Sequence, residues 1–571
     1  MCSHKINKIS DILCYICSSD CQTGPQDMLN THKTIMLVLA IASAVMMSLP
    51  FLIPGLGPMA LFGLVPLLCL DKIATDERVR KVWIWHYSTF VLWNALTVWW
   101  VCNATLGGGL FAILANALQM SVIWALFRAS KKIFRGVLPY LFLMVMWIAW
   151  ERWYFGTQIS FPWLVLGNAF AGTHKLIQWY EFTGSLGGSL WIWGCNLSVF
   201  GLIVCAAENR FAAWTSWAKR YCALGVLMLF AGPVALSLII YNNYKVETDD
   251  QLDVVIAQPN IDPYNKFFAL SQAQQNGIIA PLIEKGLAEV EDTSALKPVM
   301  VLTPETFTRY IANNYPGEDS TVKFADALAA GHPGTNIILG AATKTYYFSK
   351  EAPNILAYPA GDGAWFNTHN SAVMLDGTGR HQIFHKSKLV VGTELTPYPK
   401  IFVPLDNWLG QSMARDIGQE EISLLDVKAG DRTIPVGCAI CYESVYGEYC
   451  TDYVRKGAQA MTIITNDAWW GDTPGYRQHF NYARLRAIEL RRDIARCGNT
   501  GISGIINSRG DAVIKGPWWE PTVITGKVNL RSDETFFVRT GDFPGRICTM
   551  AFLLLFLAMI VRRFIPEHLR K

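Results

Sequence analysis

The segment Val436-Gly-Cys-Ala-Ile-Cys-Tyr-Glu443 has the sequence of a buried β-strand that ends at Cys441 and is followed by a polar pair. Apolar residues fill the strand, and the thiol stands at its end, where a rigid sheet can present a side chain at its rim. Two roles fit a cysteine at such a position, a nucleophile or a small side chain packed in the core. The segment therefore predicts a sheet and leaves the role of Cys441 open.

Short runs rich in Val and Ile on both sides of this segment predict further strands. They are separated by Gly, Pro and Asn, residues that are typical of turns. Amphipathic stretches at about 269–291, 319–330 and 475–494 predict helices between them. This alternation is typical of an α/β layered domain, which we place at residues 242–540. The predicted strands are Leu252–Gln258, Val299–Thr303, Asn336–Ala342, Ser371–Leu375, Thr433–Cys441, Met461–Thr465 and Gly501–Ile506.

The chain of 571 residues is 51% hydrophobic and only 16% charged, whereas soluble proteins carry about 25% charged residues. The apolar excess lies in residues 34–241 and 545–561. Because about 20 apolar residues suffice to cross a bilayer, we expect about eight transmembrane helices. Seven belong to a membrane domain at 34–241, and the last lies in the terminal segment 541–571. The predicted spans are 34–54, 59–70, 82–102, 110–127, 136–151, 186–206, 221–241 and 547–561.

Basic residues are distributed unevenly among the predicted loops. They gather in alternate loops and after the last span, whereas the short loop at 103–109 has none. Since basic loops remain in the cytoplasm, both termini are expected there and the α/β domain outside. The basic residues of two loops and the tail are Arg128, Lys131, Lys132, Arg135, Arg210, Lys219, Arg220, Arg562, Arg563, Arg570 and Lys571.

Residues 1–33 are polar and predict a disordered cytoplasmic tail. Their four cysteines have a spacing that resembles part of a zinc site, but no histidine follows at the spacing of metal ligands. No metal ion or organic cofactor is therefore indicated. The net charge of +4, with no basic stripe, argues against nucleic-acid binding. The cysteines of the tail are Cys2, Cys14, Cys17 and Cys21.

One predicted outer loop, residues 152–185, is apolar and aromatic, and it contains Phe161-Pro-Trp163. It either lies in the headgroup layer or packs against a neighbouring span, and both alternatives stay open. Glu151 precedes this loop at the end of a predicted span. Ionisable groups within a membrane are often functional, but at the edge of a span this carboxylate is expected to reach water.

Three reactive or charged residues of the α/β domain end or follow apolar runs: Glu305, Lys386 and Cys441. Partial burial raises the pKa of a carboxyl group and makes it a better base at neutral pH. A nearby lysine stabilises an oxyanion and lowers the pKa of a thiol. A base, a cation and a thiol at one site would support covalent acyl transfer. Spacing alone does not establish this, since a cysteine at a strand end is more often core packing.

These three residues, in this order, resemble the Glu, Lys and Cys triad of the nitrilase (carbon–nitrogen hydrolase) superfamily. Together with the spans they resemble one branch of it, the apolipoprotein N-acyltransferase family. The similarity covers about residue 34 to the C-terminus and is most specific at 436–505. It rests on Cys441-Tyr-Glu443, Thr465-Asn-Asp-Ala-Trp-Trp-Gly-Asp472, Gln478-His-Phe480, Ala483-Arg-Leu-Arg-Ala-Ile-Glu489, Asn499-Thr-Gly501 and Phe161-Pro-Trp163.

The resemblance implies an αββα sandwich for residues 242–540. It implies Glu305 as the general base, Lys386 as the catalytic lysine and Cys441 as the nucleophile. Thr303-Pro-Glu305 departs from a common Trp-Pro-Glu, and Gly392-Thr-Glu394 from Phe-Gly-Glu. These departures, and a Phe in place of a Trp at 267, concern the lipid pocket and remove no catalytic atom. Supporting or substrate-contacting roles are implied for Glu394, Tyr442, Glu443, Phe267 and Trp469.

Structural roles compete with functional ones at several of these positions. Glu394 and Glu443 fit an ion pair with Lys386 or Lys388 as well as catalysis. Trp469 fits a lipid-facing lip or core packing equally, as does Trp470. The residues expected to be structural are Cys438, which should pack in the core, His479, and the pair Arg486 and Glu489, which should form a salt bridge.

The resemblance implies an enzyme, an acyltransferase of class EC 2.3.1. It would N-acylate the N-terminal diacylglyceryl-cysteine of an apolipoprotein with a phospholipid acyl chain, through a thioester on Cys441, as the last step of lipoprotein maturation. The implied partners are the phospholipid donor, the diacylglyceryl-apolipoprotein acceptor and membrane lipid. A monomer in the bacterial inner membrane is expected, with its catalytic domain facing the periplasm.

Two other classes of protein remain as alternatives. A membrane-tethered amidase or nitrilase that hydrolyses a small C–N compound would use the same triad. A lipoprotein-binding protein without activity would not need Glu305, Lys386 and Cys441. The eight predicted spans and the aromatic outer loop favour lipid substrates over the amidase.

Overall fold

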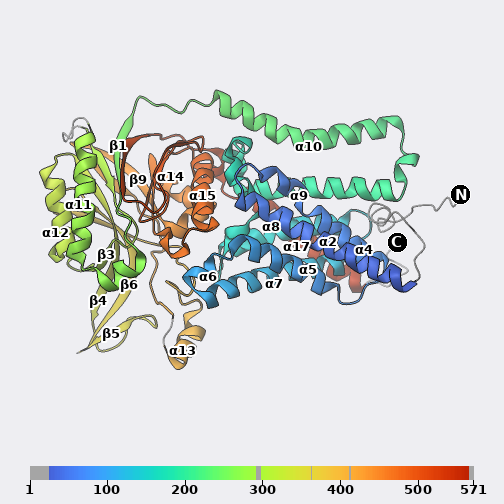
Figure 1. Ribbon diagram of the computed structural model, residues 1–571, viewed down its shortest axis with the longest axis horizontal. Helices are drawn as coiled ribbons and strands as arrows, with labels where there is room; N and C mark the ends of the chain where they lie inside the picture. Colours follow the sequence, from blue (N-terminus) through green and yellow to red (C-terminus); the bar gives the residue numbers. More distant parts are fainter. Residues whose placement is uncertain (1–24, 291–296, 362, 411–412, 565–571) are drawn as a thin grey trace.

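The computed structural model describes residues 25–290, 297–361, 363–410 and 413–564. The chain forms a bundle of apolar helices joined to an α/β domain (Figure 1). The bundle takes residues 25–243 and the final helix, and the α/β domain lies between them in the sequence.

Helices occupy all eight places where spans were predicted. Among the described residues, six are long and apolar enough to cross a membrane by length and composition. The other two, α5 and α8, pack in the same bundle, α5 against α2 and α7, and α8 against α17. The bundle helices are α2 (Pro25–Leu52), α3 (Ala60–Gly63) with α4 (Val65–Asp76), α5 (Val82–Val98), α7 (Leu106–Ser130), α8 (Leu138–Phe155), α9 (Tyr180–Ala207), α10 (Ser216–Asn243) and α17 (Phe543–Phe564).

The prediction of a disordered tail up to residue 33 was wrong from Pro25 onward, where α2 already begins. Proline fits the first turn of a helix because its missing N–H would have no partner there. Polar residues at the start of a long helix were therefore mistaken for a tail. The cysteines at positions 2, 14, 17 and 21 lie outside the described residues.

The aromatic outer loop folds into two short 3₁₀ helices, η2 (Pro162–Leu164) and η3 (Leu166–Leu176). It packs against α9 and against helix α15 of the α/β domain, so the packing alternative is correct. Glu151 is only 1% exposed, and its carboxylate accepts hydrogen bonds from Trp147 Nε1 at 3.1 Å and Leu166 N at 2.8 Å. The expectation that Glu151 reaches water was wrong, because the loop folds over it.

Two sheets pack face to face in the α/β domain. The first has the order β14-β1-β2-β4-β6-β5, with β3 beside β4 and β7 beside β6, and the second β13-β12-β11-β10-β9-β8. The first contains β1 (Gln251–Gln258), β2 (Val299–Leu302), β3 (Thr308–Ala312), β4 (Thr335–Phe348), β5 (Tyr358–Gly361), β6 (Ala364–Leu375), β7 (His381–His385) and β14 (Thr522–Asn529). The second contains β8 (Leu425–Ala429), β9 (Arg432–Ile440), β10 (Ala460–Thr465), β11 (Ile494–Gly498), β12 (Gly504–Ile506) and β13 (Ala512–Lys515).

Helices cover the outer face of each sheet, which confirms the αββα sandwich (Figure 1). α11 (Gln272–Glu289) and α12 (Ser320–Gly331) lie on the first sheet, and α14 (Gly447–Arg455) and α15 (Pro474–Leu490) on the second. All seven predicted strands are present. The helix predicted at 475–494 was too long, because Arg491 adopts a left-handed φ of 48° and Ile494–Gly498 pairs with β10 as a strand.

α15 lies between the second sheet and the helical bundle and joins the two parts of the molecule. The side-chain oxygen of Gln478 accepts hydrogen bonds from Trp163 Nε1 at 2.7 Å and Trp100 Nε1 at 3.2 Å. The side-chain nitrogen of Gln478 donates to Thr97 O at 3.1 Å. Tyr482 donates to the Trp163 carbonyl at 2.7 Å. Since buried polar groups are costly when unpaired, these bonds hold the α/β domain in one position on the bundle.

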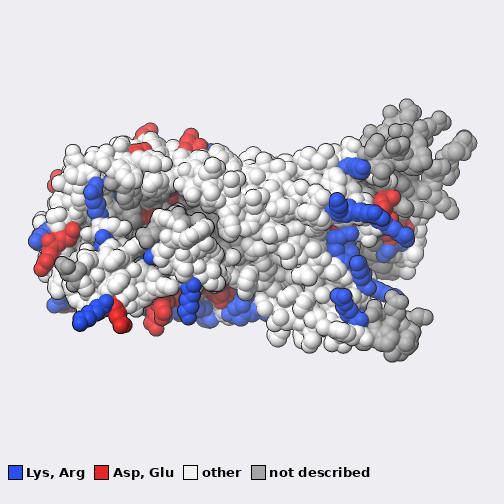
Figure 2. Space-filling view, turned by 90° about the horizontal axis from the view of Figure 1, so that it is seen from below, with Lys and Arg blue, Asp and Glu red and all other residues white. Residues whose placement is uncertain are grey.

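Charged residues are distributed unevenly along the long axis of the molecule. Lys and Arg gather at the end of the bundle that is remote from the α/β domain, and a broad band between that end and the domain shows neither sign (Figure 2). α17 ends there with Arg562 and Arg563 in its last turn, and the Arg562 guanidinium lies over the Phe134 ring at 5.8 Å. An uncharged band bounded by basic residues is typical of a membrane-spanning surface.

Candidate active site

Cys441 stands directly after β9, on the first residue of the short helix η7 (Cys441–Val445). Its φ of 51° lies in the left-handed region, which costs a non-glycine residue about 1–3 kcal/mol. The side chain is 9% exposed, so bulk water barely reaches the thiol. The turn places the thiol near the carboxylate of Glu305, and the two groups shift each other's pKa.

Glu443 fixes this turn from within. One of its oxygens accepts the N–H of Ile440 at 2.7 Å, and the other accepts Ser387 N at 2.7 Å and the Tyr449 hydroxyl at 2.6 Å. The side chain is fully buried, and in the described part of the chain it accepts backbone N–H groups rather than pairing with a lysine. Glu443 therefore links the segment that carries Cys441 to the segment that carries Lys386.

Glu305 follows β2 at the edge of the first sheet and is 5% exposed. One carboxylate oxygen accepts hydrogen bonds from Lys386 Nζ at 3.0 Å and Asn370 Nδ2 at 2.7 Å, and the other accepts Asn466 N at 3.0 Å. Gly340 allows this packing, since a Cβ there would lie 2.1 Å from the Pro304 carbonyl oxygen. The carboxylate is thus held by donors from three different elements.

Lys386 follows β7 and is 1% exposed. Besides Glu305, its ammonium group contacts the carboxylate of Glu394 at 2.8 Å. Asn370 bridges the same two carboxylates, since its amide also donates to Glu394 at 2.8 Å. Glu394 therefore makes the ion pair with Lys386 that was one of the two roles left open for it.

The pKa values of Glu305 and Lys386 shift in the direction opposite to the one that burial alone would give. Burial raises the pKa of Glu305, but Lys386 and the hydrogen bonds from Asn370 and Cys441 outweigh it and hold that pKa below its ordinary value. Burial, followed by the charge of Glu305, raises the pKa of Cys441 well above its ordinary value despite Lys386. Burial lowers the pKa of Lys386, but Glu305 and Glu394 more than reverse this. The expected directions were therefore wrong for both groups: at Glu305, Lys386 and the hydrogen bonds outweigh burial, and at Cys441, burial and the charge of Glu305 outweigh Lys386.

The remaining predicted residues lie around this centre at different distances from it. Tyr442 is buried, and its hydroxyl donates to the Ser160 carbonyl of the outer loop at 3.1 Å. The Trp469 ring packs edge-on against Tyr264 at 5.6 Å and is partly exposed. Phe267 falls in the segment Asn265–Ala269, but its side chain lies outside the described residues.

Several of the alternatives left open are decided by packing. Trp470 packs in the joint with the bundle, with its ring centroid 4.6 Å from that of Trp100. Cys438 is buried in β9 as expected, and Arg486 pairs with Glu489 at 2.7 Å.

Two residues of the centre were not identified from the sequence. Asn370 belongs to no sequence motif, and only the structure shows that its side chain bridges the carboxylates of Glu305 and Glu394. Lys266 is 2% exposed, and its ammonium group donates to the Glu305 carbonyl at 3.0 Å and to Thr306 Oγ1 at 3.3 Å. Burial, opposed by the charge of Glu305, lowers the pKa of Lys266 to about 7. The available signal was that Lys266 directly precedes the apolar residues 267–270.

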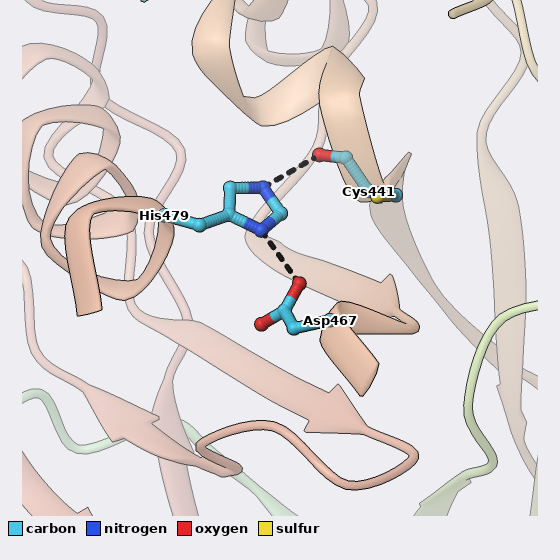
Figure 3. A group of neighbouring side chains, drawn as sticks. All are labelled: Cys441, Asp467 and His479. Atoms are coloured by element: carbon cyan, nitrogen blue, oxygen red, sulfur yellow. Dashed lines mark hydrogen bonds and ion pairs between the residues drawn. The ribbon is translucent and has the colours of Figure 1, made fainter. Parts of the chain in front are cut away.

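The Cys441 thiol, Asp467 and His479 lie close enough together to suggest a metal site, with ligand atoms within 4.8 Å of one another (Figure 3). The guanidinium of Arg496, however, donates to Asp467 at 2.7 Å and lies 3.1 Å from His479 Nδ1. A fixed cation already neutralises Asp467, and burial is outweighed by Arg496 and His479 so that its pKa falls to about 2. The group therefore fits a hydrogen-bonded network better than a metal site.

Comparison with known proteins places this centre in a family. The model of the carbon–nitrogen hydrolases matches residues 268–534, and that of the apolipoprotein N-acyltransferase N-terminal domain matches residues 43–198. An apolipoprotein N-acyltransferase of Chlorobaculum tepidum is 28% identical over 519 residues, which are 89% of this chain and 93% of that protein. The chain belongs to the apolipoprotein N-acyltransferase family.

Other members of the apolipoprotein N-acyltransferase family match along nearly the whole chain. The Geobacter metallireducens protein is 26% identical over 527 residues, covering 90% of this chain and 92% of its own length. The Haemophilus influenzae protein is 24% identical over 541 residues, covering 92% and 95%. A crystal structure of Saccharomyces cerevisiae Nit3, a nitrilase-superfamily member, is 16% identical with a TM-score of 0.35, covering 52% of this chain and 96% of Nit3.

Proposed function

We propose that this chain transfers an acyl chain from a phospholipid to the free α-amino group of a diacylglyceryl-cysteine at the N-terminus of an apolipoprotein. The observation that carries the proposal is the buried Cys441 thiol beside Glu305, whose carboxylate is ion-paired with Lys386, at the place where the α/β domain rests on the bundle. Glu305 and Lys386 are its proposed catalytic partners, and the whole centre comes from one chain, which supports action as a monomer.

The first half-reaction forms a thioester. Glu305 is charged at rest and Cys441 is protonated, so the thiol proton passes to the Glu305 carboxylate as sulfur attacks the ester carbonyl carbon of the phospholipid. The Lys386 ammonium group stabilises the oxyanion that forms. The ester C–O bond then breaks, the proton on Glu305 passes to the leaving glycerol oxygen, and a lysophospholipid departs.

The second half-reaction forms the amide. The α-amino nitrogen of the lipoprotein attacks the thioester carbonyl carbon, and Glu305 accepts the proton that nitrogen loses. The C–S bond breaks, and the proton returns from Glu305 to the Cys441 sulfur. Both half-reactions use the same base and the same cation, so the chemistry is of the ping-pong type. The low exposure of Cys441 keeps water from competing with the amine for the thioester.

The position of the centre suits substrates that are anchored in a membrane. Moving a whole acyl chain into water would cost roughly 0.8 kcal/mol per CH₂, or on the order of 10 kcal/mol for a chain. A catalytic domain held on its own spans avoids that cost, because ester and amine both lie near the headgroups. Tyr442 and Gln478 fix the domain at this height through their bonds to the outer loop and the bundle.

Helix α13 (Pro399–Leu409) offers a surface for lipid near the centre. It begins five residues after Glu394, and the backbone N–H of Tyr398 at its start donates to Gln158 in the outer loop. Its apolar side chains are exposed: Ile401 67%, Leu405 43% and Trp408 81%. The helix lies at the level where the α/β domain meets the bundle (Figure 1), where exposed apolar groups can enter the headgroup layer.

The charge distribution supports a bacterial inner-membrane location with the catalytic domain outside the cytoplasm. The basic end of the bundle would face the cytoplasm, and the α/β domain, at the opposite end, would face the periplasm (Figure 2). In this orientation Cys441 stands on the side of the membrane where exported lipoproteins arrive.

Hydrolysis of a small soluble C–N compound by the same triad is the alternative function. It requires neither the joint between Gln478 and the bundle nor the exposed apolar face of α13, and both of these favour lipid substrates. Mass spectrometry of lipoprotein N-terminal peptides, from cells that lack this protein, separates the two. Loss of only the amide-linked chain, restored by the wild-type chain, supports the transferase, and unchanged lipoproteins would reject it.

A further inference from the structure

His479 lies on α15, directly beneath the turn that carries Cys441, and its ring is fully buried. Ring nitrogen Nε2 lies 3.1 Å from the Cys441 carbonyl oxygen and 3.0 Å from the Ser444 hydroxyl oxygen. Nδ1 lies 2.9 Å from Asp467 Oδ1 (Figure 3) and 3.1 Å from an Arg496 nitrogen. The ring therefore spans the distance between the nucleophile's own peptide and a buried ion pair.

The hydrogen atoms of this network can be assigned from its donors. The Ser444 hydroxyl donates its one hydrogen to the Cys441 carbonyl at 2.8 Å. Nε2 of His479 then faces two oxygens that offer only lone pairs to it, and a hydrogen on Nε2 satisfies them. At Nδ1 the ring has both a donor, Arg496, and an acceptor, Asp467, so that nitrogen is satisfied with or without a hydrogen.

The Cys441 carbonyl needs such donors because the residue is held in an unfavourable conformation. A left-handed φ of 51° is rarely adopted by cysteine, and relaxation to an ordinary backbone region would rotate both its carbonyl and its side chain. Two hydrogen bonds to the carbonyl, from Ser444 and His479, oppose that rotation. The Trp163 and Trp470 rings pack on the imidazole at 5.7 and 5.6 Å and fix its orientation from the membrane side.

We propose that His479 is a positioning residue: its Nε2 hydrogen bond to the Cys441 carbonyl holds the strained turn that directs the thiol at Glu305. This inference rests on the proposed role of Cys441 as the nucleophile. His479 does not touch the reacting atoms, and Asp467 and Arg496 act through it. Nε2 makes the hydrogen bond to the Cys441 carbonyl, and Nδ1 contacts the buried ion pair of Asp467 and Arg496.

A pair of substitutions separates the two nitrogens. In His479→Gln the side-chain amide nitrogen can occupy the place of Nε2 and still donate to Cys441, whereas in His479→Asn it can reach only the place of Nδ1. Both remove the ring, so a loss of packing affects them alike. Each full-length variant is compared with the wild type in detergent micelles for thioester formation with phospholipid, for alkylation of Cys441 by iodoacetamide, and for thermal unfolding.

The expected result is thioester formation at least about tenfold slower in His479→Asn than in His479→Gln, with similar unfolding temperatures and an unchanged phospholipid KM. Iodoacetamide should also alkylate Cys441 more slowly in His479→Asn than in His479→Gln. Equal rates in the two variants would overturn the proposal. If both fail to fold, Ser444→Ala tests the same carbonyl: slower thioester formation is expected, and a rate equal to the wild type would overturn it.

The proposed function and the proposed role of His479 can fail separately in this experiment. A wild-type chain that forms no thioester would reject the proposed function, whatever the variants do. A wild-type chain that forms the thioester, beside Gln and Asn variants that react equally, would reject only the role of His479.

Discussion

Lys386 and Glu305 form a buried ion pair, with 3.0 Å between the ammonium nitrogen and the carboxylate oxygen. They come from the ends of two strands of one sheet, whereas Cys441 comes from the end of a strand in the other. Despite burial, the pair holds the Glu305 pKa low and so keeps this proposed base ionised. Because burial and Glu305 hold the pKa of the Cys441 thiol high, this proposed nucleophile stays protonated until it attacks.

The two carboxylates beside Lys386 should contribute unequally. Glu305→Gln removes the proposed base, and thioester formation should fall about 10²–10⁴-fold. Glu394→Gln removes one negative charge but leaves Glu305 in contact with both Lys386 and Asn370, so a smaller loss is expected. Single-turnover measurements with labelled phospholipid give both rates. Equal losses in the two variants would show that proton transfer is not specific to Glu305.

The reactivity of the thiol should depend on pH in a way that its surroundings explain. Only the thiolate is alkylated, and burial together with Glu305 holds the Cys441 pKa above 9.0. Alkylation of Cys441 by iodoacetamide should therefore keep accelerating above pH 9. In Glu305→Gln a negative charge is removed, so the midpoint of the profile should move to lower pH. Mass spectrometry of the Cys441 peptide measures this site alone, and a wild-type midpoint below pH 8 would contradict the account.

The joint between the domain and the bundle should contribute to stability. Gln478→Leu leaves the indole N–H of Trp163 buried without its partner, which typically costs about 1–3 kcal/mol. Gln251→Leu, an exposed position on β1, is the matched control and should change little. Thermal unfolding of both variants in the same detergent gives the comparison. If the two variants unfold alike, the joint is not held by this hydrogen bond.

The exposed face of α13 should matter only when the substrate is in a membrane. Ile401→Ser with Trp408→Ser should slow thioester formation from phospholipid vesicles by about three- to tenfold, because less apolar area enters the headgroup layer. Iodoacetamide alkylation of Cys441 should not change, since the helix contributes no group to the centre. Phe348→Ser, which removes an equally exposed apolar group on β4, serves as control. A similar loss in the control would remove the special role of α13.

Helices and strands could be predicted from the sequence more reliably than the tertiary contacts between them. Glu305, Lys386 and Cys441 could be singled out because each ends or follows an apolar run, but a strand's sequence does not say which strand ends lie opposite it in the second sheet. Only the family resemblance joined the three. Asn370 escaped notice for the same reason, since its importance lies in bridging Glu305 and Glu394 across strands.

The wrong expectations share a physical cause. Burial could be inferred for Glu305 and Cys441, and burial alone raises both pKa values. The net direction at Glu305 depends on Lys386, Asn370 and Cys441, which approach it only in the folded chain. Glu151 was expected to reach water for a related reason: the loop that covers it follows α8 directly, but the sequence does not show that this loop folds back over the carboxylate.

The central claim is that Cys441 carries the acyl chain. The direct measurement is intact mass spectrometry of the purified full-length protein after incubation with phospholipid and without an amine acceptor. The account predicts an added mass of one acyl chain on the Cys441 peptide, removed by hydroxylamine and absent from Cys441→Ala. A Cys441→Ala protein that still accumulates the covalent acyl species would contradict it.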